Sequence, residues 1–165
     1  MVNKDQLFQE IFKANSKKIY HLCYGYTGDS ELANDLMQET FLKVWQNLEK
    51  FRNQAMISTW IYRIAVNTCL SHLRVEKRQV KEELTEQIIE TKAEDFSEKN
   101  EQVALLYRCI AKLEENERII ITMVLDELPY AEIAEISGIS EGNLRVKIHR
   151  IKQKLTELYK KHERF

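Results

Sequence analysis

The sequence predicts an all-α protein built from two small helical domains. Apolar residues recur at spacings of three and four over most of the chain. The 165 residues include one proline and four glycines, a composition that disfavours a loop-rich β protein. Residues 76–97 differ from the rest, because they are charged, poor in aromatic residues and only weakly periodic. We therefore expect domains over residues 1–75 and 98–165, joined by a flexible linker over residues 76–97.

The first half is expected to hold three helices. The first lies within residues 7–23. A turn follows over residues 27–30, where Asp29 or Ser30 is placed to cap a second helix over residues 32–48.

After a break over residues 51–55, Ser58 or Thr59 is expected to cap a third helix that runs from Trp60 towards Arg78. Five polar residues share one face of this helix: Arg63, Asn67, Ser71, Arg74 and Arg78. A basic face with hydrogen-bonding groups beside aromatic residues suits single-stranded DNA, whose phosphates and unstacked bases are bound together. Trp60 itself is expected in the core.

The second half is expected to end in a helix-turn-helix. Helices are predicted over residues 103–113 and 119–125, followed by two more that are separated at residues 137–140. Gly138 stands where the chain must reverse, and Ser140 is placed to cap the last helix.

The last helix is predicted to be amphipathic. Its apolar stripe consists of Leu144, Ile148, Ile151 and Leu155. The opposite face carries Gly142, Val146, His149, Arg150 and Gln153, flanked by Asn143 and Arg145. An apolar back and outward-facing donors are what a DNA-recognition helix needs. The same stripe also fits a surface helix of any α-helical domain, but the glycine turn, the cap and the basic face favour DNA.

Charge is segregated along the chain, although the net charge is only −1. Residues 82–101 contain eight acids and two bases, whereas residues 143–165 contain eight bases and two acids. The basic end indicates either a polyanion-binding surface or a solvated helix face, and charge alone does not separate them.

Composition argues against several other classes of protein. No run of about 18 apolar residues occurs, so we expect no membrane insertion. The first residues lack the apolar core of a signal peptide, which leads us to expect a cytoplasmic protein. Cys23, Cys69 and Cys109 are widely spaced, and the histidines are scattered. We therefore expect ordinary reduced thiols, no metal and no cofactor.

Three segments resemble motifs of sigma factors of the sigma-70 class. Residues 31–45, ELANDLMQETFLKVW, resemble their core-polymerase-binding helix. Phe51-Arg52 and residues 58–67 are similar to their promoter-melting segment, and residues 130–145 resemble their upstream-element reader. The resemblance covers residues 7–75 and 103–160, and so short a chain resembles the extracytoplasmic-function (ECF) group. It implies that the domains are sigma region 2 and sigma region 4.

The resemblance implies roles for individual residues. Contacts to the β′ clamp of core RNA polymerase fall to Asp35, Gln38 and Glu39. Residues expected to bind the promoter −10 element are Phe51, Arg52, Asn53, Ser58, Arg63, Asn67 and Arg74. The −35 element falls to Asn143, Arg145, Lys147, His149 and Arg150. Asn143 and Val146 depart from common family residues, so the promoter sequence read is expected to differ from that of better-known relatives. Asn53 stands where the family often has glycine, and the fold is expected to tolerate it.

The function implied is promoter recognition and melting within RNA polymerase, with partners at the β′ clamp and the β flap, and with promoter DNA. The polymerase supplies the catalysis, so the chain itself is not expected to be an enzyme. The resemblance leaves open whether an anti-sigma factor binds it. One alternative is a free-standing helix-turn-helix regulator, which would bind duplex DNA tightly without polymerase. A helical enzyme is disfavoured by the lack of convergent His, Cys and carboxylate motifs.

Overall fold

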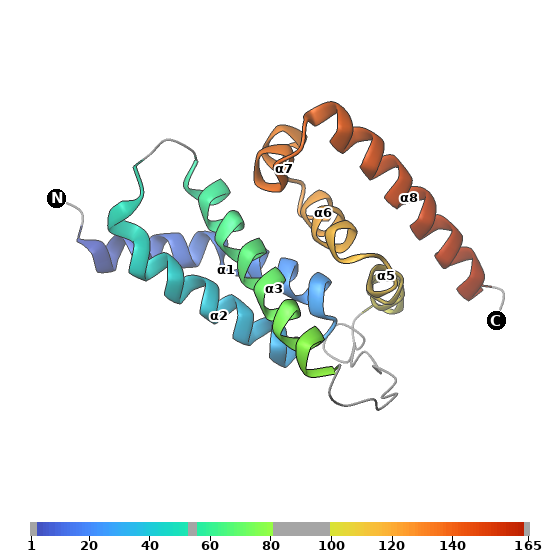
Figure 1. The fold of residues 1–165 in the computed structure, drawn as a ribbon, viewed down its shortest axis with the longest axis horizontal. Coiled ribbons are helices and arrows are strands. Elements are labelled where there is room, and N and C mark those ends of the chain that lie inside the picture. Colours follow the sequence, from blue (N-terminus) through green and yellow to red (C-terminus); the bar gives the residue numbers. More distant parts are fainter. Residues whose placement is uncertain (1–2, 53–55, 81–99, 164–165) are drawn as a thin grey trace.

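The computed structural model describes residues 3–52, 56–80 and 100–163, and every regular element in these ranges is a helix (Figure 1). The first half contains α1 (Lys4–Thr27), α2 (Ser30–Asn47), the 3-10 helix η1 (Leu48–Lys50) and α3 (Ile57–Val80). The second half contains α5 (Glu101–Ala111), α6 (Glu115–Leu125), α7 (Tyr130–Ser137) and α8 (Glu141–Glu163). The predicted all-α class is confirmed.

The turn between α1 and α2 forms where it was predicted. Gly28 ends α1 in the left-handed region, with a φ of 67° that glycine adopts at little cost. The Asp29 carboxylate accepts hydrogen bonds from the backbone N–H groups of Glu31 at 2.9 Å and Leu32 at 3.3 Å. Asp29, and not Ser30, therefore caps α2.

The ends of α3 differ from those predicted. The helix begins at Ile57 rather than Trp60, so Ser58 and Thr59 lie inside its first turn and neither caps it. Ile57 packs against the core and Thr59 is buried, which draws an extra turn into the helix. At the other end α3 continues to Val80, so residues 76–80 of the predicted linker are helical. The rest of that linker, residues 81–97, lies outside the described residues.

The helix-turn-helix is present in the second half. Gly138 ends α7 with a φ of 72°, and its N–H donates to the carbonyl of Ala134 at 2.9 Å. The hydroxyl of Ser140 accepts from the backbone N–H of Asn143 at 3.2 Å, as predicted for the cap of α8. Ile139 packs against the core between the two helices.

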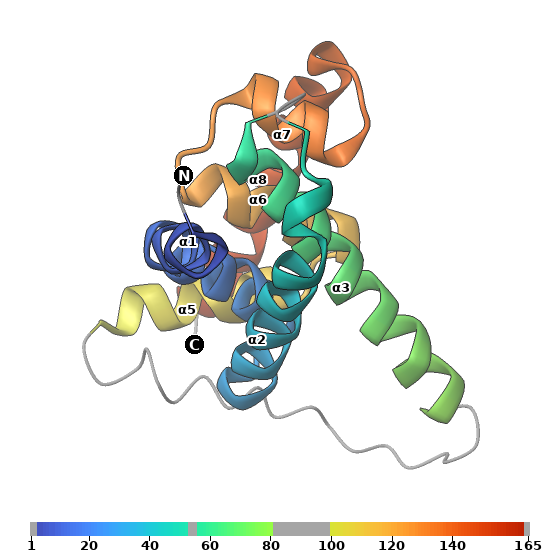
Figure 2. The ribbon, with the colours of Figure 1, turned by 90° about the vertical axis from the view of Figure 1, so that its left-hand side faces the viewer.

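The two halves pack against each other and share one continuous core. Helix α1 packs against α2 and α3 on one side and against α5 and α6 on the other. The start of α3 lies against α7, as the two views in Figures 1 and 2 show. One close contact is at Gly25 of α1, where an added Cβ would overlap the hydroxyl of the buried Thr122 of α6. Sequence patterns predicted the two units but not this packing.

Polar contacts also join the halves. The Nδ1 atom of His21 lies 3.0 Å from a carboxylate oxygen of Asp126. The guanidinium carbon of Arg118 lies 5.3 Å from the centre of the Tyr26 ring, a cation–π arrangement. Together with the apolar contacts, these pairs fix how the halves are oriented.

We predict that Gly25→Ala destabilises the protein. In an unpacked helix this change would stabilise by about 1 kcal/mol, because alanine has the higher helix propensity. Here the new methyl group would clash with Thr122, so we expect a loss of about 1–3 kcal/mol in the free energy of unfolding, measured in urea. Adding Thr122→Ala should recover part of that loss. A stabilising effect of Gly25→Ala would contradict the packing of α1 on α6.

Candidate nucleic-acid and partner interfaces

Helix α2 presents a polar face to solvent. The three residues predicted to dock on polymerase are all exposed, and Gln38 and Glu39 lie one turn after Asp35. The structure therefore brings them together on one face. Glu39 also forms an exposed ion pair with Lys43, with 3.2 Å between the charged atoms. The opposite side of the helix is buried through Leu36 and Val44.

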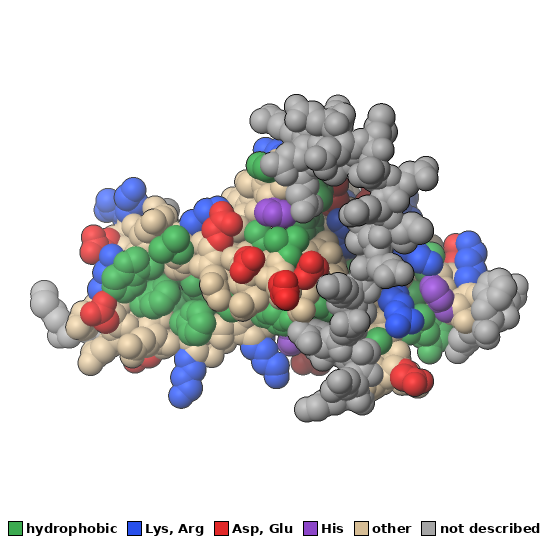
Figure 3. Space-filling model, turned by 90° about the horizontal axis from the view of Figure 1, so that it is seen from below, with side chains coloured by type: hydrophobic (Ala, Val, Ile, Leu, Met, Phe, Trp, Pro, Cys, Tyr) green, Lys and Arg blue, Asp and Glu red, His purple; other side chains and the backbone are tan. Residues whose placement is uncertain are grey.

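Sequence reasoning missed Leu42, which belongs to the same face of α2. It lies four residues after Gln38 and its side chain is 56% exposed. The signal was available, because Leu42 falls outside the buried stripe of this helix. Figure 3 shows hydrophobic and acidic side chains side by side on the lower side of the molecule. A single exposed leucine is common on protein surfaces, but this one adds an apolar group to the face that the resemblance assigns to polymerase.

The predicted single-strand face of α3 is partly formed. Asn67, Ser71 and Arg74 are exposed along the helix, whereas the side chain of Arg78 is not among those described. Arg63 is half-buried, and its Nη2 atom donates to the backbone carbonyl of Glu135 at 3.3 Å and lies 3.4 Å from the Glu135 carboxylate. Because Glu135 belongs to α7, Arg63 is occupied by the second half.

The loop before α3 is described only at its two ends. Phe51 is half-buried and its ring centre lies 5.0 Å from that of Trp60, which packs against the core as expected. Arg52 is exposed, Asn53 lies outside the described residues, and Ser58 is half-buried in the first turn of α3. Met56, with a 63% exposed side chain, adds an apolar group that the prediction did not single out.

Helix α8 has the two faces that were predicted. Leu144, Ile148 and Ile151 are buried against the second half. On the other face, Lys147 is partly buried. The other predicted −35 residues are exposed: Asn143, Arg145, His149 and Arg150.

Arg145 is held in place within this face. Its guanidinium lies 2.9 Å from the Glu141 carboxylate one turn earlier and 5.1 Å from the centre of the Tyr130 ring. Both contacts lie at the surface and are weak, so they orient the side chain without preventing it from reaching an anion. A basic helical face that is exposed over several turns is suited to phosphates and base edges.

The cysteines pack as apolar groups. The Sγ atoms of Cys23 and Cys69 lie 3.8 Å apart in the core of the first half. The hydrogen bond between them, and then burial, raise the pKa of Cys23 far above its ordinary value. Burial likewise raises the pKa of Cys109. Thiols in such surroundings react poorly. Within the described ranges no three His, Cys, Asp or Glu side chains are grouped to hold a metal ion.

Two family models match the chain. Sigma-70 region 2 matches residues 11–79, and Sigma-70, region 4 matches residues 104–155. They fall on the two halves. Among the described helices, none is sufficiently long and apolar to cross a membrane.

Individual proteins point the same way. The ECF RNA polymerase sigma factor SigW of Bacillus subtilis is 32% identical over 161 residues, covering 90% of this chain and 86% of SigW. SigM of the same organism is 27% identical over 153 residues, covering 91% and 93%.

Solved structures share the fold. The sigma factor RpoE from Bartonella quintana, in complex with the anti-sigma factor NepR, has a TM-score of 0.77 at 20% identity, covering 93% of this chain and 96% of RpoE. CnrH, in complex with the cytosolic domain of CnrY, has a TM-score of 0.66 at 18% identity, covering 93% and 88%. The alternative of a free-standing regulator is not favoured by any of these matches. The sequence relatives and the two family models show that the chain belongs to the sigma-70 family as an ECF RNA polymerase sigma factor.

Proposed function

We propose that the two halves of this sigma factor divide promoter recognition between them. The first half docks on core polymerase and captures the opened −10 element, and α8 binds the −35 element as duplex. The observation that carries this proposal is the basic outer face of α8, exposed on a helix-turn-helix whose apolar side is buried. The polymerase performs the chemistry, so the chain acts as a non-enzymatic factor in the cytoplasm.

The docking surface consists of Asp35, Gln38, Glu39 and Leu42 on α2. The acidic groups steer a basic partner surface such as the β′ clamp, which raises the association rate more than the final affinity. Leu42 supplies affinity, because burying a leucine side chain is worth about 1.5–3 kcal/mol. A polar rim around an apolar centre is the usual anatomy of a protein interface.

For the −10 element we propose that Asn67 reads a base while Arg74 contacts phosphates. The asparagine amide has both a donor and an acceptor, and it is exposed on α3. A base that leaves the stack costs a few kcal/mol, so the protein must offer compensating contacts. We propose that the loop before α3 holds that base through Phe51, Arg52 and Ser58. Asn53 belongs to the same proposed group by sequence.

For the −35 element we propose contacts from Asn143, Arg145, Lys147, His149 and Arg150. The tip of α8 would lie in the major groove, where arginine can bind guanine through two hydrogen bonds. Contact with the β flap of the polymerase belongs to this half by family resemblance.

Full engagement of DNA requires the halves to separate. In the packed arrangement Arg63 is directed at Glu135 of α7, so binding of the −10 strand by Arg63 would have to replace this contact. Residues 81–99, which join the halves, can span at most roughly 65 Å when fully extended. The two promoter elements are separated by about one and a half duplex turns, roughly 50 Å, which is within that reach.

An anti-sigma factor is a further proposed partner. The RpoE structure of this fold contains the anti-sigma factor NepR, and the CnrH structure contains the cytosolic domain of CnrY. Both support a protein that binds this chain and withholds it from polymerase.

We predict that charge reversal on α2 abolishes docking. Asp35→Lys with Glu39→Lys should weaken binding to core polymerase by at least about 30-fold, since like charges would face the clamp. Binding is measured by titration of labelled chain with core enzyme, and helical content by circular dichroism. Glu10→Lys with Glu157→Lys makes the same charge change at exposed positions on α1 and α8 and should bind normally. Wild-type affinity of the α2 variant would rule this surface out.

Changing Asn67→Ala should reduce transcription from a fully duplex promoter by about tenfold, as expected for loss of one base contact worth about 1–3 kcal/mol. Binding to core polymerase and to −35 duplex should stay unchanged. Permanganate reactivity of unpaired thymines measures the open complex, and Asn116→Ala at an exposed position on α6 serves as the matched control. If open-complex formation is unaffected by Asn67→Ala, the −10 base is read elsewhere.

A further inference from the structure

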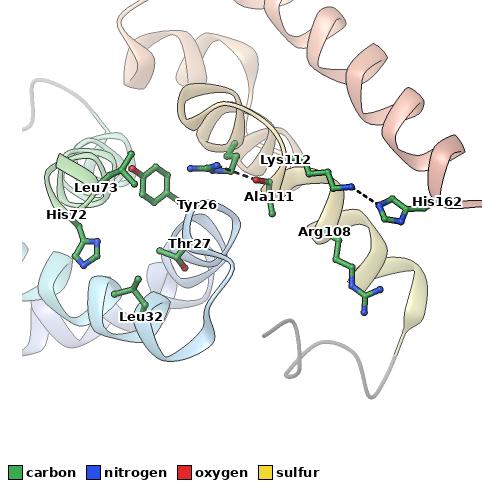
Figure 4. A pocket seen from close by; sticks show the side chains of 10 residues that line it. Tyr26, Thr27, Leu32, His72, Leu73, Arg108, Ala111, Lys112 and His162 are labelled. Atoms are coloured by element: carbon green, nitrogen blue, oxygen red, sulfur yellow. Dashed lines mark hydrogen bonds between the residues drawn. The ribbon is translucent and has the colours of Figure 1, made fainter. Parts of the chain in front are cut away.

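A cavity of about 390 Å³ lies where the two halves meet. Its walls come from α1, α2 and α3 on one side and from α5, α6 and α8 on the other (Figure 4). This volume falls within the range of small-molecule sites, about 300–1,000 Å³. Leu32 of the cavity lies one turn before Asp35 on α2, but none of the residues proposed to bind polymerase or DNA is among the lining residues, so the proposed function does not use the cavity.

One wall of the cavity is strongly basic. Arg108, Lys112 and Arg118 line it together with His162, and no acidic side chain is among the described lining residues. The Nζ of Lys112 lies 3.1 Å from the Nε2 of His162. An ammonium group can only donate, so the ring nitrogen accepts in this contact. Three basic side chains without a described acidic partner indicate a site for an anion.

Arg118 is oriented but not saturated. Its Nη1 donates to the backbone carbonyl of Leu113 at 3.0 Å, and its ring contact with Tyr26 crosses to the first half. Its buried Nε has no hydrogen-bond partner among the described residues. Because this Nε atom is closed to solvent, an anion in the cavity would contact the rest of the Arg118 side chain, which lines the basic wall.

The opposite wall is mixed, with Thr27 and His72 beside its apolar residues. Leu32 and Leu73 face the basic side chains, with the ring of Tyr26 beside them (Figure 4). An inorganic anion would leave these apolar residues without a contact, whereas a ligand with an apolar ring would cover them. Arginine pairs readily with phosphate through two parallel hydrogen bonds.

We propose that this cavity binds a phosphorylated small molecule of the nucleotide class. Its phosphates lie on Arg108, Lys112 and Arg118, and its base lies against Leu32 and Leu73. Because the walls belong to both halves, the ligand binds the packed arrangement better than a separated one and shifts the population towards it. Binding itself does not depend on the proposed function, but any effect on transcription would rest on it.

The test is calorimetric titration of the full chain, without polymerase or DNA, with ATP, tripolyphosphate and adenosine. We expect saturable binding of ATP. Tripolyphosphate lacks the base and adenosine lacks the phosphates, so each should bind at least about tenfold more weakly. ATP should also raise the thermal unfolding temperature.

Arg108→Ala with Lys112→Ala should weaken ATP binding by at least about tenfold, since two charge-assisted contacts are lost. Both residues are exposed, so the fold should persist, and Arg108→Glu alone provides a second variant. Lys17→Ala with Lys18→Ala removes the same charge from an exposed part of α1 and should bind ATP normally.

Three results would overturn the proposal. The first is the absence of saturable ATP binding up to roughly 10 mM, a Kd that corresponds to a binding free energy of about −3 kcal/mol. The second is equal affinity of the cavity variants and the wild type, which would put the ligand elsewhere. The third is equal affinity for ATP and tripolyphosphate, which would mean that the apolar residues of the opposite wall play no part.

Discussion

The packing of α1 on α6 organises the whole molecule. At Gly25 the α1 backbone lies so close to the side chain of Thr122 that an added Cβ would overlap its hydroxyl, and His21 pairs with Asp126 one turn away. Because α1 is also the central helix of the first half, this contact makes a single core out of two units that are separate in sequence. The orientation of every other surface follows from it.

This packing has different consequences for the proposed interfaces. The polar face of α2 and the outer face of α8 remain open to solvent, so polymerase and duplex DNA can meet them without rearrangement. The single-strand face of α3 is only partly open, because Arg63 is bonded to Glu135 of α7. The exposed ion pair contributes little to stability, so separation is opposed mainly by the apolar contacts around α1. A partner separates the halves if its preference for the separated arrangement exceeds the free energy of these apolar contacts.

Local features of the fold were predictable from sequence because they depend on neighbouring residues. A cap at Asp29 or Ser30, a reversal of the chain at Gly138 and the amphipathic pattern of α8 were predicted, and the structure has the cap at Asp29, a left-handed Gly138 and the two faces of α8. The start of α3 was predicted wrongly, since Ser58 and Thr59 are good caps in isolation but burial of Thr59 and packing of Ile57 extended the helix. Burial of this kind depends on distant segments, which local propensity does not register.

The same limit applies to the candidate sites. The exposed faces of α2 and α8 followed from helical spacing, but the pairing of Arg63 with Glu135 joins residues far apart in sequence. The interdomain cavity has no linear motif either, because its basic wall is assembled from α5, α6 and α8.

The central claim is that the halves are packed together in the free protein and separate on the promoter. Fluorescent labels on Gln46→Cys in α2 and Gln153→Cys in α8, both exposed, report the distance between the halves by energy transfer. We expect a single, narrowly distributed distance in the free chain and a longer one after core polymerase and promoter DNA are added. A broad range of distances in the free chain, or an unchanged distance in the promoter complex, would contradict the claim.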